Sequence, residues 1–310
     1  MSYGNLFKGS AVALALLAGA IQFSSVAHAQ VVVSSKIDTE GGVLGNIILA
    51  VLNANGIQTT DRIQLGATPV VRKAITAGEI DIYPEYTGNA AFFFLQQGGR
   101  PAVERCRQGV RDCEEARLRR QQDCLARPSP ANNTWGIAVR KDVADENKLT
   151  NLSEFGKYIS GGGKVILAAS SEFVNSAAAL PAFQTAYSFT LKPDQLITLS
   201  GGDTAATIAA AANQTNGANA AMVYGTDGGI APSGLVVLED DKHVQPVYQP
   251  APIIREEVLK KNPKIEELLK PVFAKLDLTT LQELNGRVQL GGEPAKAVAE
   301  EFLKTNGFLK

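Results

Sequence analysis

Gly78-Glu79-Ile80-Asp81-Ile82-Tyr83-Pro84-Glu85-Tyr86-Thr87-Gly88 is the most informative stretch of the sequence. Its apolar part, residues 80–83, has the composition of a short buried strand, and Pro84 is expected to end that strand because proline donates no ladder hydrogen bond. Toward the N-terminus the residue patterns predict a helix over 68–77, an extended segment over 57–66, a helix from about 43 to a cap at Gly56, and a strand at Val31-Val32-Val33. Strands therefore alternate with helices, which is typical of α/β architecture.

A second series of the same kind begins at Trp135-Gly136-Ile137-Ala138-Val139. Helices are expected over 152–159 and 205–212, and a helix N-cap at Ser170-Ser171. Strands are expected at 165–168, 221–224 and 235–238, followed by three helical stretches at 265–276, 279–288 and 294–302. The sequence thus predicts two α/β lobes.

The two lobes are expected to be discontinuous along the chain. Residues 30–134 and 242–310 are assigned to lobe I and residues 135–241 to lobe II, with crossovers near 128–136 and 236–248 and the C-terminal helices returning to lobe I. About 280 residues are large for one hydrophobic core and suit two lobes of about 100 to 150 residues.

The N-terminus has the pattern of a cleaved signal peptide. Lys8 precedes an apolar run over 11–21 that ends at Ala27-His28-Ala29, a small-x-small cleavage site. The alternative, an uncleaved membrane anchor, is disfavoured because the run is shorter than the roughly 20 residues that span a bilayer. We expect a mature chain that starts at Gln30 and, with no cysteine at the cleavage site, is soluble in the periplasm.

Composition argues against several classes of function. The chain has 30 basic and 31 acidic residues, and loss of Lys8 with the leader makes it slightly more acidic, so nucleic acid is not an expected partner. Only His243 would remain as a histidine base, and it lies among charged residues typical of a solvated loop. Gly201-Gly202-Asp203-Thr204 is either an anion-binding helix N-terminus or a simple helix cap. No catalytic residue, metal site or cofactor is expected.

The ordered motifs of the chain resemble the substrate-binding proteins of osmoprotectant ABC importers, which handle glycine betaine, carnitine and choline. Besides the opening stretch, the resemblance rests on the segments Ser35-Lys36-Ile37-Asp38-Thr39-Glu40, Leu65-Gly66-Ala67-Thr68, Asn132-Asn133-Thr134-Trp135, Tyr224-Gly225-Thr226-Asp227, and Tyr248 with Pro252 to Glu257. It covers nearly the whole mature chain and is closest to the stress-induced, low-affinity branch. It implies a type II two-lobed (Venus-flytrap) binding protein, monomeric, with an inner-membrane ABC permease as partner.

The resemblance places the ligand in a cage of aromatic side chains between the lobes. Trp135, Tyr224 and Tyr248 stand where the family has cage walls. A trimethylammonium group donates no hydrogen bond, so aromatic faces are what select it. Aromatic residues at strand ends also commonly pack one lobe on another, and only the resemblance favours the cage.

Further ligand contacts follow from the same resemblance. Thr87 and Asn89 are expected contacts, and Asn89 matches a position where relatives use Thr or Asp. Glu40 and Gly41 are expected contacts too, and Gly41 stands where many relatives have a ligand-contacting Gln. Ser170 and Ser171 either offer hydroxyls or amides to a ligand carboxylate or only cap a helix.

Residues 100–127 differ in composition from the rest. They hold all 3 cysteines, Cys106, Cys113 and Cys124, and most of the arginines. Three thiols in an oxidising compartment leave at least one unpaired. Either this is a basic surface helix, or the segment is read in a shifted frame that would replace Val110 with a tyrosine matching a further cage aromatic.

Two other functions remain open at this point. The first is a binding protein for another small zwitterion or an amino acid, and the second is a secreted hydrolase on the same two-lobed scaffold.

Overall fold

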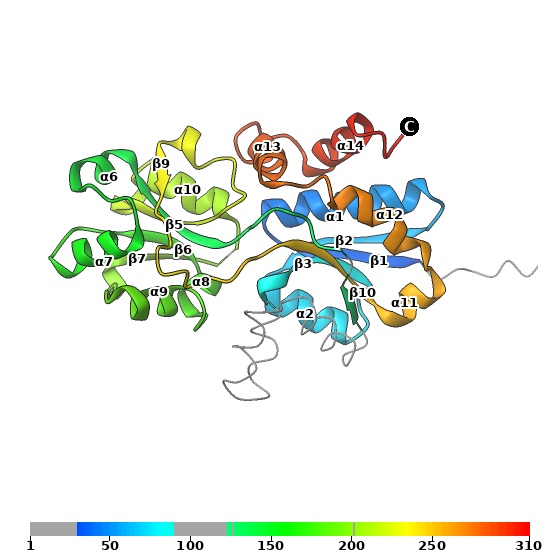
Figure 1. The fold of residues 1–310 in the computed structure, drawn as a ribbon, viewed down its shortest axis with the longest axis horizontal. Helices are drawn as coiled ribbons and strands as arrows, with labels where there is room; N and C mark the ends of the chain where they lie inside the picture. The colour runs from blue at the N-terminus through cyan, green and yellow to red at the C-terminus, as the bar shows by residue number, and fades with distance from the viewer. Residues whose placement is uncertain (1–29, 90–122, 126, 201) are drawn as a thin grey trace, which may run out of the picture.

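Two α/β lobes lie side by side in the computed structural model, which describes residues 30–89, 123–125, 127–200 and 202–310 (Figure 1). Lobe I is built on a sheet of strand order β2-β1-β3-β10-β4, and lobe II on a sheet of order β7-β6-β8-β5-β9. Two extended segments connect them. The expected leader, residues 1–29, and nearly all of residues 100–127 lie outside the described residues, so the structure tests neither interpretation of the cysteine-rich segment.

Lobe I combines N-terminal and C-terminal segments of the chain. Its strands are β1 (Val31–Lys36), β2 (Thr59–Gly66), β3 (Ile82–Tyr86), β4 (Asp123–Leu125) and β10 (Pro250–Arg255). Its helices are α1 (Thr39–Ala54), α2 (Thr68–Thr76), η1 (Thr87–Asn89), α11 (Glu256–Lys261), α12 (Lys264–Phe273), α13 (Leu278–Gln289) and α14 (Ala295–Thr305). One apolar core joins α1 to α12, α13 and α14, because Val43, Leu44 and Ile47 are buried together with Leu269, Leu281 and Val298.

Lobe II is built from the middle of the chain. Its strands are β5 (Trp135–Arg140), β6 (Leu167–Ser170), β7 (Leu196–Leu199), β8 (Ala220–Tyr224) and β9 (Leu235–Val237). Its helices are α6 (Lys141–Asn147), α7 (Leu152–Ser160), α8 (Ser171–Asn175), α9 (Leu180–Tyr187), η2 (Pro193–Gln195), α10 (Thr204–Ala212), η3 (Thr215–Gly217) and η4 (Ala231–Ser233). Separate apolar clusters, one around Phe155 and Phe183 and one around Ile208 and Val223, cover the two faces of the sheet.

The expectation that Pro84 ends its strand is wrong. Strand β3 continues through Pro84 to Tyr86 and pairs antiparallel with β10, where Pro252 stands opposite Pro84. The Thr87 amide donates to the Gln249 carbonyl at 3.0 Å, so alternate pairs of this ladder are hydrogen-bonded and the Pro84 pair falls between them. Two prolines that face each other at a non-hydrogen-bonded pair remove no hydrogen bond from the ladder.

The second crossover begins later than residue 242. Lys242 donates to the Ala186 carbonyl at 2.6 Å and Gln245 to the Ala178 carbonyl at 2.7 Å, both in lobe II. Residues 242–245 therefore stay on lobe II before the chain returns to lobe I. Asp203 caps α10, because its side chain accepts from the Ala205 amide at 3.1 Å, while Gly201 lies outside the described residues.

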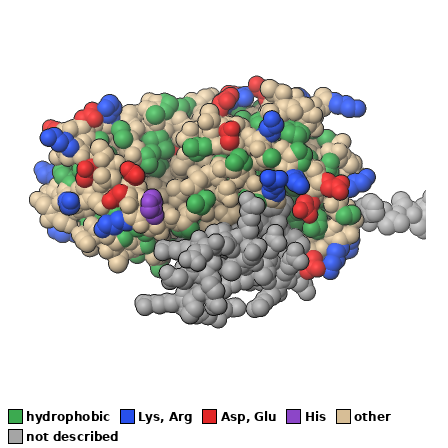
Figure 2. Space-filling view, in the orientation of Figure 1, with side chains coloured by type: hydrophobic (Ala, Val, Ile, Leu, Met, Phe, Trp, Pro, Cys, Tyr) green, Lys and Arg blue, Asp and Glu red, His purple; other side chains and the backbone are tan. Residues whose placement is uncertain are grey.

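The described helices are too short or too polar to cross a bilayer. On the face drawn in Figure 2, acidic and basic side chains are interspersed over both lobes and no large area carries a single sign.

Candidate functional site

A cavity lies where the two lobes and the two crossovers meet. The cavity has a volume of about 20 Å³ and is partly open to solvent. Lobe I contributes Lys36, Asp38, Thr68, Tyr86 and Asn89 to its wall. Lobe II contributes Trp135 and Tyr224, and the crossovers contribute Asn133 and Tyr248. Both lobes therefore have to be in place for the cavity to exist.

Aromatic side chains form one side of the cavity. Trp135 begins β5 and Tyr224 ends β8, and the two residues stand opposite each other in the antiparallel ladder. The Trp135 ring lies 5.8 Å from the Tyr248 ring and meets Phe173 edge-on at 6.0 Å. Strand ends bring these rings together, in the position where α/β lobes form ligand clefts.

Gly88 is required for the position of Tyr248. A Cβ added at Gly88 would lie 2.7 Å from carbons of the Tyr248 ring, closer than real contacts allow. The Tyr248 backbone is fixed as well, because its amide donates to Asn132 Oδ1 at 2.8 Å and its carbonyl accepts from the Asn133 amide at 2.8 Å. The glycine that closes the opening motif of the sequence thus makes room for an aromatic wall of the cavity.

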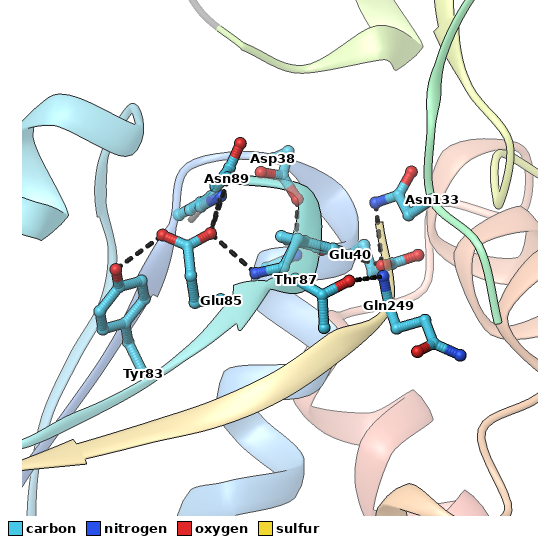
Figure 3. A network of polar contacts seen from close by, with 11 residues as sticks. Asp38, Glu40, Tyr83, Glu85, Thr87, Asn89, Asn133 and Gln249 are labelled. Atoms are coloured by element: carbon cyan, nitrogen blue, oxygen red, sulfur yellow. Dashed lines mark hydrogen bonds and ion pairs between the residues drawn. The ribbon is translucent and has the colours of Figure 1, made fainter. Parts of the chain in front are cut away.

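A buried ion pair lies behind the lobe I wall. Glu85 is 2 % exposed, and its Oε1 accepts from Lys36 Nζ at 2.6 Å. Figure 3 shows two further donors to Glu85: Asn89 Nδ2 lies 2.7 Å from Oε1, and the Tyr83 hydroxyl lies 2.7 Å from Oε2. Burial alone would raise the pKa of Glu85, but the Lys36 ammonium and these donors hold it below its usual value. Glu85 therefore fixes the side chains of Lys36 and Asn89 at the cavity.

Glu40 connects the lobes without lining the cavity. Its Oε1 accepts from the Tyr86 hydroxyl at 2.8 Å and from Asn133 Nδ2 at 3.0 Å, and its Oε2 accepts from Asn285 Nδ2 at 2.7 Å. Asn285 also donates to the Thr226 carbonyl of lobe II at 2.9 Å. Burial raises the pKa of Glu40 to about 7 despite these donors.

Helix α13 of lobe I holds the turn that follows β8 in lobe II. Gln282 donates to the Gly225 carbonyl at 3.0 Å, and Gln289 donates to Asp227 at 2.8 Å. Burial raises the pKa of Asp227 to about 6, although the Tyr224 amide, Thr204 and Gln289 all donate to it. The backbones approach closely here, since a Cβ at Gly228 would lie 2.0 Å from the Gln282 carbonyl oxygen.

The structure brings together four of the site residues expected from the sequence: Trp135, Tyr224, Tyr248 and Asn89 all line the cavity. Thr87 is buried beside them, and its hydroxyl donates to the Val247 carbonyl at 3.0 Å and accepts from the Gln249 amide at 3.0 Å (Figure 3). It links β3 to the second crossover.

The remaining expected residues lie away from the cavity wall. A side chain at Gly41 would meet the Lys36 carbonyl, since a Cβ there would be 2.5 Å from that oxygen. Ser170 caps α8 by accepting from the Phe173 amide at 3.1 Å, and Ser171 accepts from Asn175 at 3.2 Å. In this structure Ser170 has the helix-capping role that the sequence left open, and Ser171 is the first residue of α8.

Five cavity residues were missed by sequence reasoning, although all of them lie in or beside the quoted motifs: Lys36, Asp38, Thr68, Tyr86 and Asn133. Lys36 is the last residue of β1 and Asp38 follows it, and Thr68 begins α2 just after β2. The rule that ligands bind at the carboxyl ends of parallel strands could have identified these three.

A two-lobed α/β chain with two crossovers and an aromatic cavity between its lobes has the architecture expected of a solute-binding protein. Residues 29–305 match the family described as the substrate binding domain of ABC-type glycine betaine transport systems, and the chain belongs to that family. The family consists of solute-binding proteins, not enzymes. The resemblance and the two-lobed α/β fold expected from the sequence are both confirmed.

Individual relatives agree with the family. The chain is 52% identical over 305 residues to the glycine betaine-binding protein YehZ of Escherichia coli K12, covering 98% of each chain. It is 25% identical over 283 residues to a glycine-betaine-binding protein of Pseudomonas aeruginosa, covering 89% of this chain and 88% of that one. The chain is thus a substrate-binding protein of the glycine betaine/choline type of ABC transporter.

Solved structures share the fold. The structure of apo YehZ from E. coli, 53% identical, superposes with a TM-score of 0.65 over 90% of this chain and 99% of that one. A glycine betaine/carnitine/choline ABC transporter structure, 20% identical, gives 0.69 over 91% and 100% and supports the fold alone.

Proposed function

We propose that the chain binds a quaternary-ammonium solute such as glycine betaine or choline in the cavity between its lobes and presents it to an ABC permease in the inner membrane. The observation that carries this proposal is the convergence of Trp135, Tyr224 and Tyr248 on one cavity. Aromatic faces attract a quaternary ammonium through their negative π-surfaces, and the attraction strengthens when the contact is removed from water.

The remaining expected residues line the cavity or contact the residues that line it. Asn89, fixed by Glu85, supplies a polar wall. Thr87 and Glu40 hold the crossovers against lobe I, and Gly41 donates its amide to Asp38 at 2.7 Å, which fixes the start of α1. Ser170 caps α8, which begins at Ser171 and carries Phe173 against Trp135.

Ligand binding would act on the angle between the lobes. A solute favours the closed arrangement only to the extent that it binds that arrangement better than an open one. The contacts of α13 with the turn after β8 lie between the lobes and would change if that angle changed. Energy for transport would come from the ATPase of the importer.

The rest of the proposal concerns the setting of the protein. We propose that residues 1–29 direct export to the periplasm and are removed before Gln30. The mature protein would be a monomer, with residues 30–134 and the segment after about residue 245 as lobe I and the segment between them as lobe II.

Calorimetric titration of residues 30–310 with glycine betaine, choline, carnitine and proline tests the proposal. We expect saturable binding of at least one methylammonium compound and none of proline. Binding of proline without any methylammonium compound would overturn the ligand class. Turnover of ester or phosphate substrates that survives substitution of His243 and the cage aromatics would favour the hydrolase instead.

A further inference from the structure

Glu40 is a buried carboxylate at the junction of the two lobes, and the side chains that donate to it are neutral. It is 4 % exposed. Tyr86 of β3, Asn133 of the first crossover and Asn285 of α13 donate to it at 2.7 to 3.0 Å, and Figure 3 shows the bond from Asn133. These groups satisfy the carboxylate oxygens but bring no positive charge. A carboxylate that is removed from water without a cation is stabilised by taking up a proton.

The lobe II side of this junction is formed by Thr226, which follows β8. Its carbonyl accepts from Asn285 at 2.9 Å. Its hydroxyl oxygen is buried without a hydrogen-bond partner among the described residues, and it lies close enough to Glu40 to affect the pKa of that carboxyl. A protonated carboxyl group donates as well as accepts, so it could donate to this oxygen, whereas a carboxylate could only accept from it. The interlobe contact therefore contains an acceptor for a proton on Glu40.

The charged groups around Glu40 do not stabilise its negative charge. The titratable groups on the surrounding elements are Asp38 before α1, Asp203 before α10, Asp227 after β8, Glu85 and Tyr86 in β3, and Lys36 in β1. The Lys36 ammonium is already paired with Glu85 at 2.6 Å. Burial raises the pKa of Glu40 to about 7 and Asp38 acts in the same direction, against the hydrogen bonds from its neutral neighbours.

We propose that ligand binding is coupled to the uptake of a proton by Glu40, so that acidic conditions strengthen binding. The inference rests on the proposed function and concerns the regulation of the same site. A ligand that contacts both lobes favours the arrangement in which they meet, and this arrangement packs Thr226 against Glu40. Separation of the lobes would let water reach the carboxylate. The proton is then held more tightly in the ligand-bound state, and by linkage the ligand is held more tightly by the protonated protein.

The coupling predicts the pH range over which affinity changes. Glu40 has a pKa of about 7 while the lobes meet, and this pKa would return toward the ordinary value of 4.5 when water reaches the group. Affinity should be highest near about pH 5, fall as the pH rises toward 7 and become constant above it, with a total loss of about tenfold or more. A trimethylammonium group has no proton to lose, and the carboxylate of glycine betaine stays ionised over this range. The ligand itself therefore cannot produce this dependence.

Calorimetric titration of residues 30–310 with glycine betaine and with choline, in buffers of equal pH but different ionisation enthalpy, counts the protons taken up. At about pH 6.5 we expect more than half a proton per bound ligand in the parent. We expect none in Glu40→Gln, whose side chain is neutral and has the shape of the protonated acid. The affinity of this variant should also vary less than about twofold between pH 5 and 8.

Asn285→Ala provides a second measurement if Glu40→Gln folds poorly. It removes a donor that stabilises the charged form of Glu40, so the pKa of Glu40 should rise. The decline of affinity should then have its midpoint at a higher pH than in the parent, whatever the affinity itself becomes. A midpoint that does not move would contradict titration of Glu40.

Asp227→Asn is the matched control. Asp227 is buried at the same junction, accepts from Gln289 of α13 at 2.8 Å and has its pKa raised by burial to about 6. Proton uptake at about pH 6.5 should remain above half of the parent value in this variant. Uptake that is lost in Asp227→Asn and retained in Glu40→Gln would overturn the role of Glu40.

Two further outcomes separate the inference from the function on which it rests. Saturable binding to the parent that depends neither on the buffer nor on pH overturns the proton coupling and leaves the proposed function standing. A parent that binds neither glycine betaine nor choline at any pH in this range overturns both.

Discussion

Replacing Trp135 with alanine should weaken ligand binding more than any other single change in the aromatic wall. The Trp135 side chain is 7 % exposed and contacts the rings of Phe173 and Tyr248. Its indole gives the strongest cation–π face, and such a contact, once desolvated, contributes about 2 kcal/mol or more, which is about thirtyfold in affinity. The same truncation removes core packing and should lower the free energy of unfolding by about 3–5 kcal/mol.

Tyr224→Phe is the control, because it keeps the ring and removes only the hydroxyl, and Trp135→Phe keeps a smaller aromatic face. Urea unfolding of each variant establishes that the titrated protein is native. Calorimetry gives the affinity, and intrinsic emission reports the site directly because the chain has 1 tryptophan. Binding by native Trp135→Ala within twofold of the parent would refute the cage. So would parent emission that does not change while calorimetry records binding. Either result would mean that Trp135 only packs the lobes.

Three further predictions concern the groups around the cavity. In Gly228→Ala the new Cβ would lie 2.0 Å from the Gln282 carbonyl oxygen, so the two lobes would have to move apart. Ligand affinity should fall more than tenfold, and the radius of gyration measured by X-ray scattering should increase. An unchanged affinity would contradict the close contact between the lobes at Gly228. Glu85→Gln should lower the free energy of unfolding, measured in urea, by about 3–5 kcal/mol, because it leaves the Lys36 ammonium buried and unpaired. A decrease below about 1 kcal/mol would argue that the ion pair is exposed to water and not buried. Glu40 has its pKa raised from 4.5 to about 7 in the folded protein, so its contribution to stability is full below about pH 4.5 and is lost as the pH rises through about 7. The free energy of unfolding should therefore decline less steeply over this pH range in Glu40→Gln than in the parent. An identical slope in the two proteins would contradict the raised pKa.

The sequence predicted the helices and strands well where a local pattern decides them. The expected helices at 152–159 and 205–212 correspond to α7 and α10, and the expected strand at 221–224 corresponds to β8. The predicted end of β3 was wrong, because the effect of a proline depends on the register of the neighbouring strand, here β10, which is distant in sequence. Pro84 stands opposite Pro252, and neither local composition nor spacing reveals which pairs of that ladder are hydrogen-bonded.

The position of two aromatic cavity residues could be predicted from the sequence, where only the resemblance favoured a cage, but the position of the charged residues could not. Trp135 and Tyr224 stand at strand ends, which the apolar pattern locates. Lys36 and Glu85 are 49 residues apart, and each is indistinguishable in sequence from an ordinary surface charge. Only their position in adjacent parts of the sheet shows that they form a buried pair and that their charges cancel.

The neutralisation of Lys36 by Glu85 affects how the site can discriminate among ligands. Glu40 and Glu85 both lie behind the cavity and accept hydrogen bonds from side chains that line it. Asn133 donates to Glu40, and both Lys36 and Asn89 donate to Glu85, so these donors are not available to a ligand. The wall that remains carries the charge of Asp38, and Trp135 Nε1 and the Tyr248 hydroxyl are buried in it without a hydrogen-bond partner among the described residues. A buried carboxylate that faces no ligand can therefore influence specificity as strongly as one that does, because it decides which atoms of its neighbours remain available. By this reasoning Glu40→Gln, which still accepts through its carbonyl but can also donate, would turn donors toward the cavity and make glycine betaine a better ligand relative to choline.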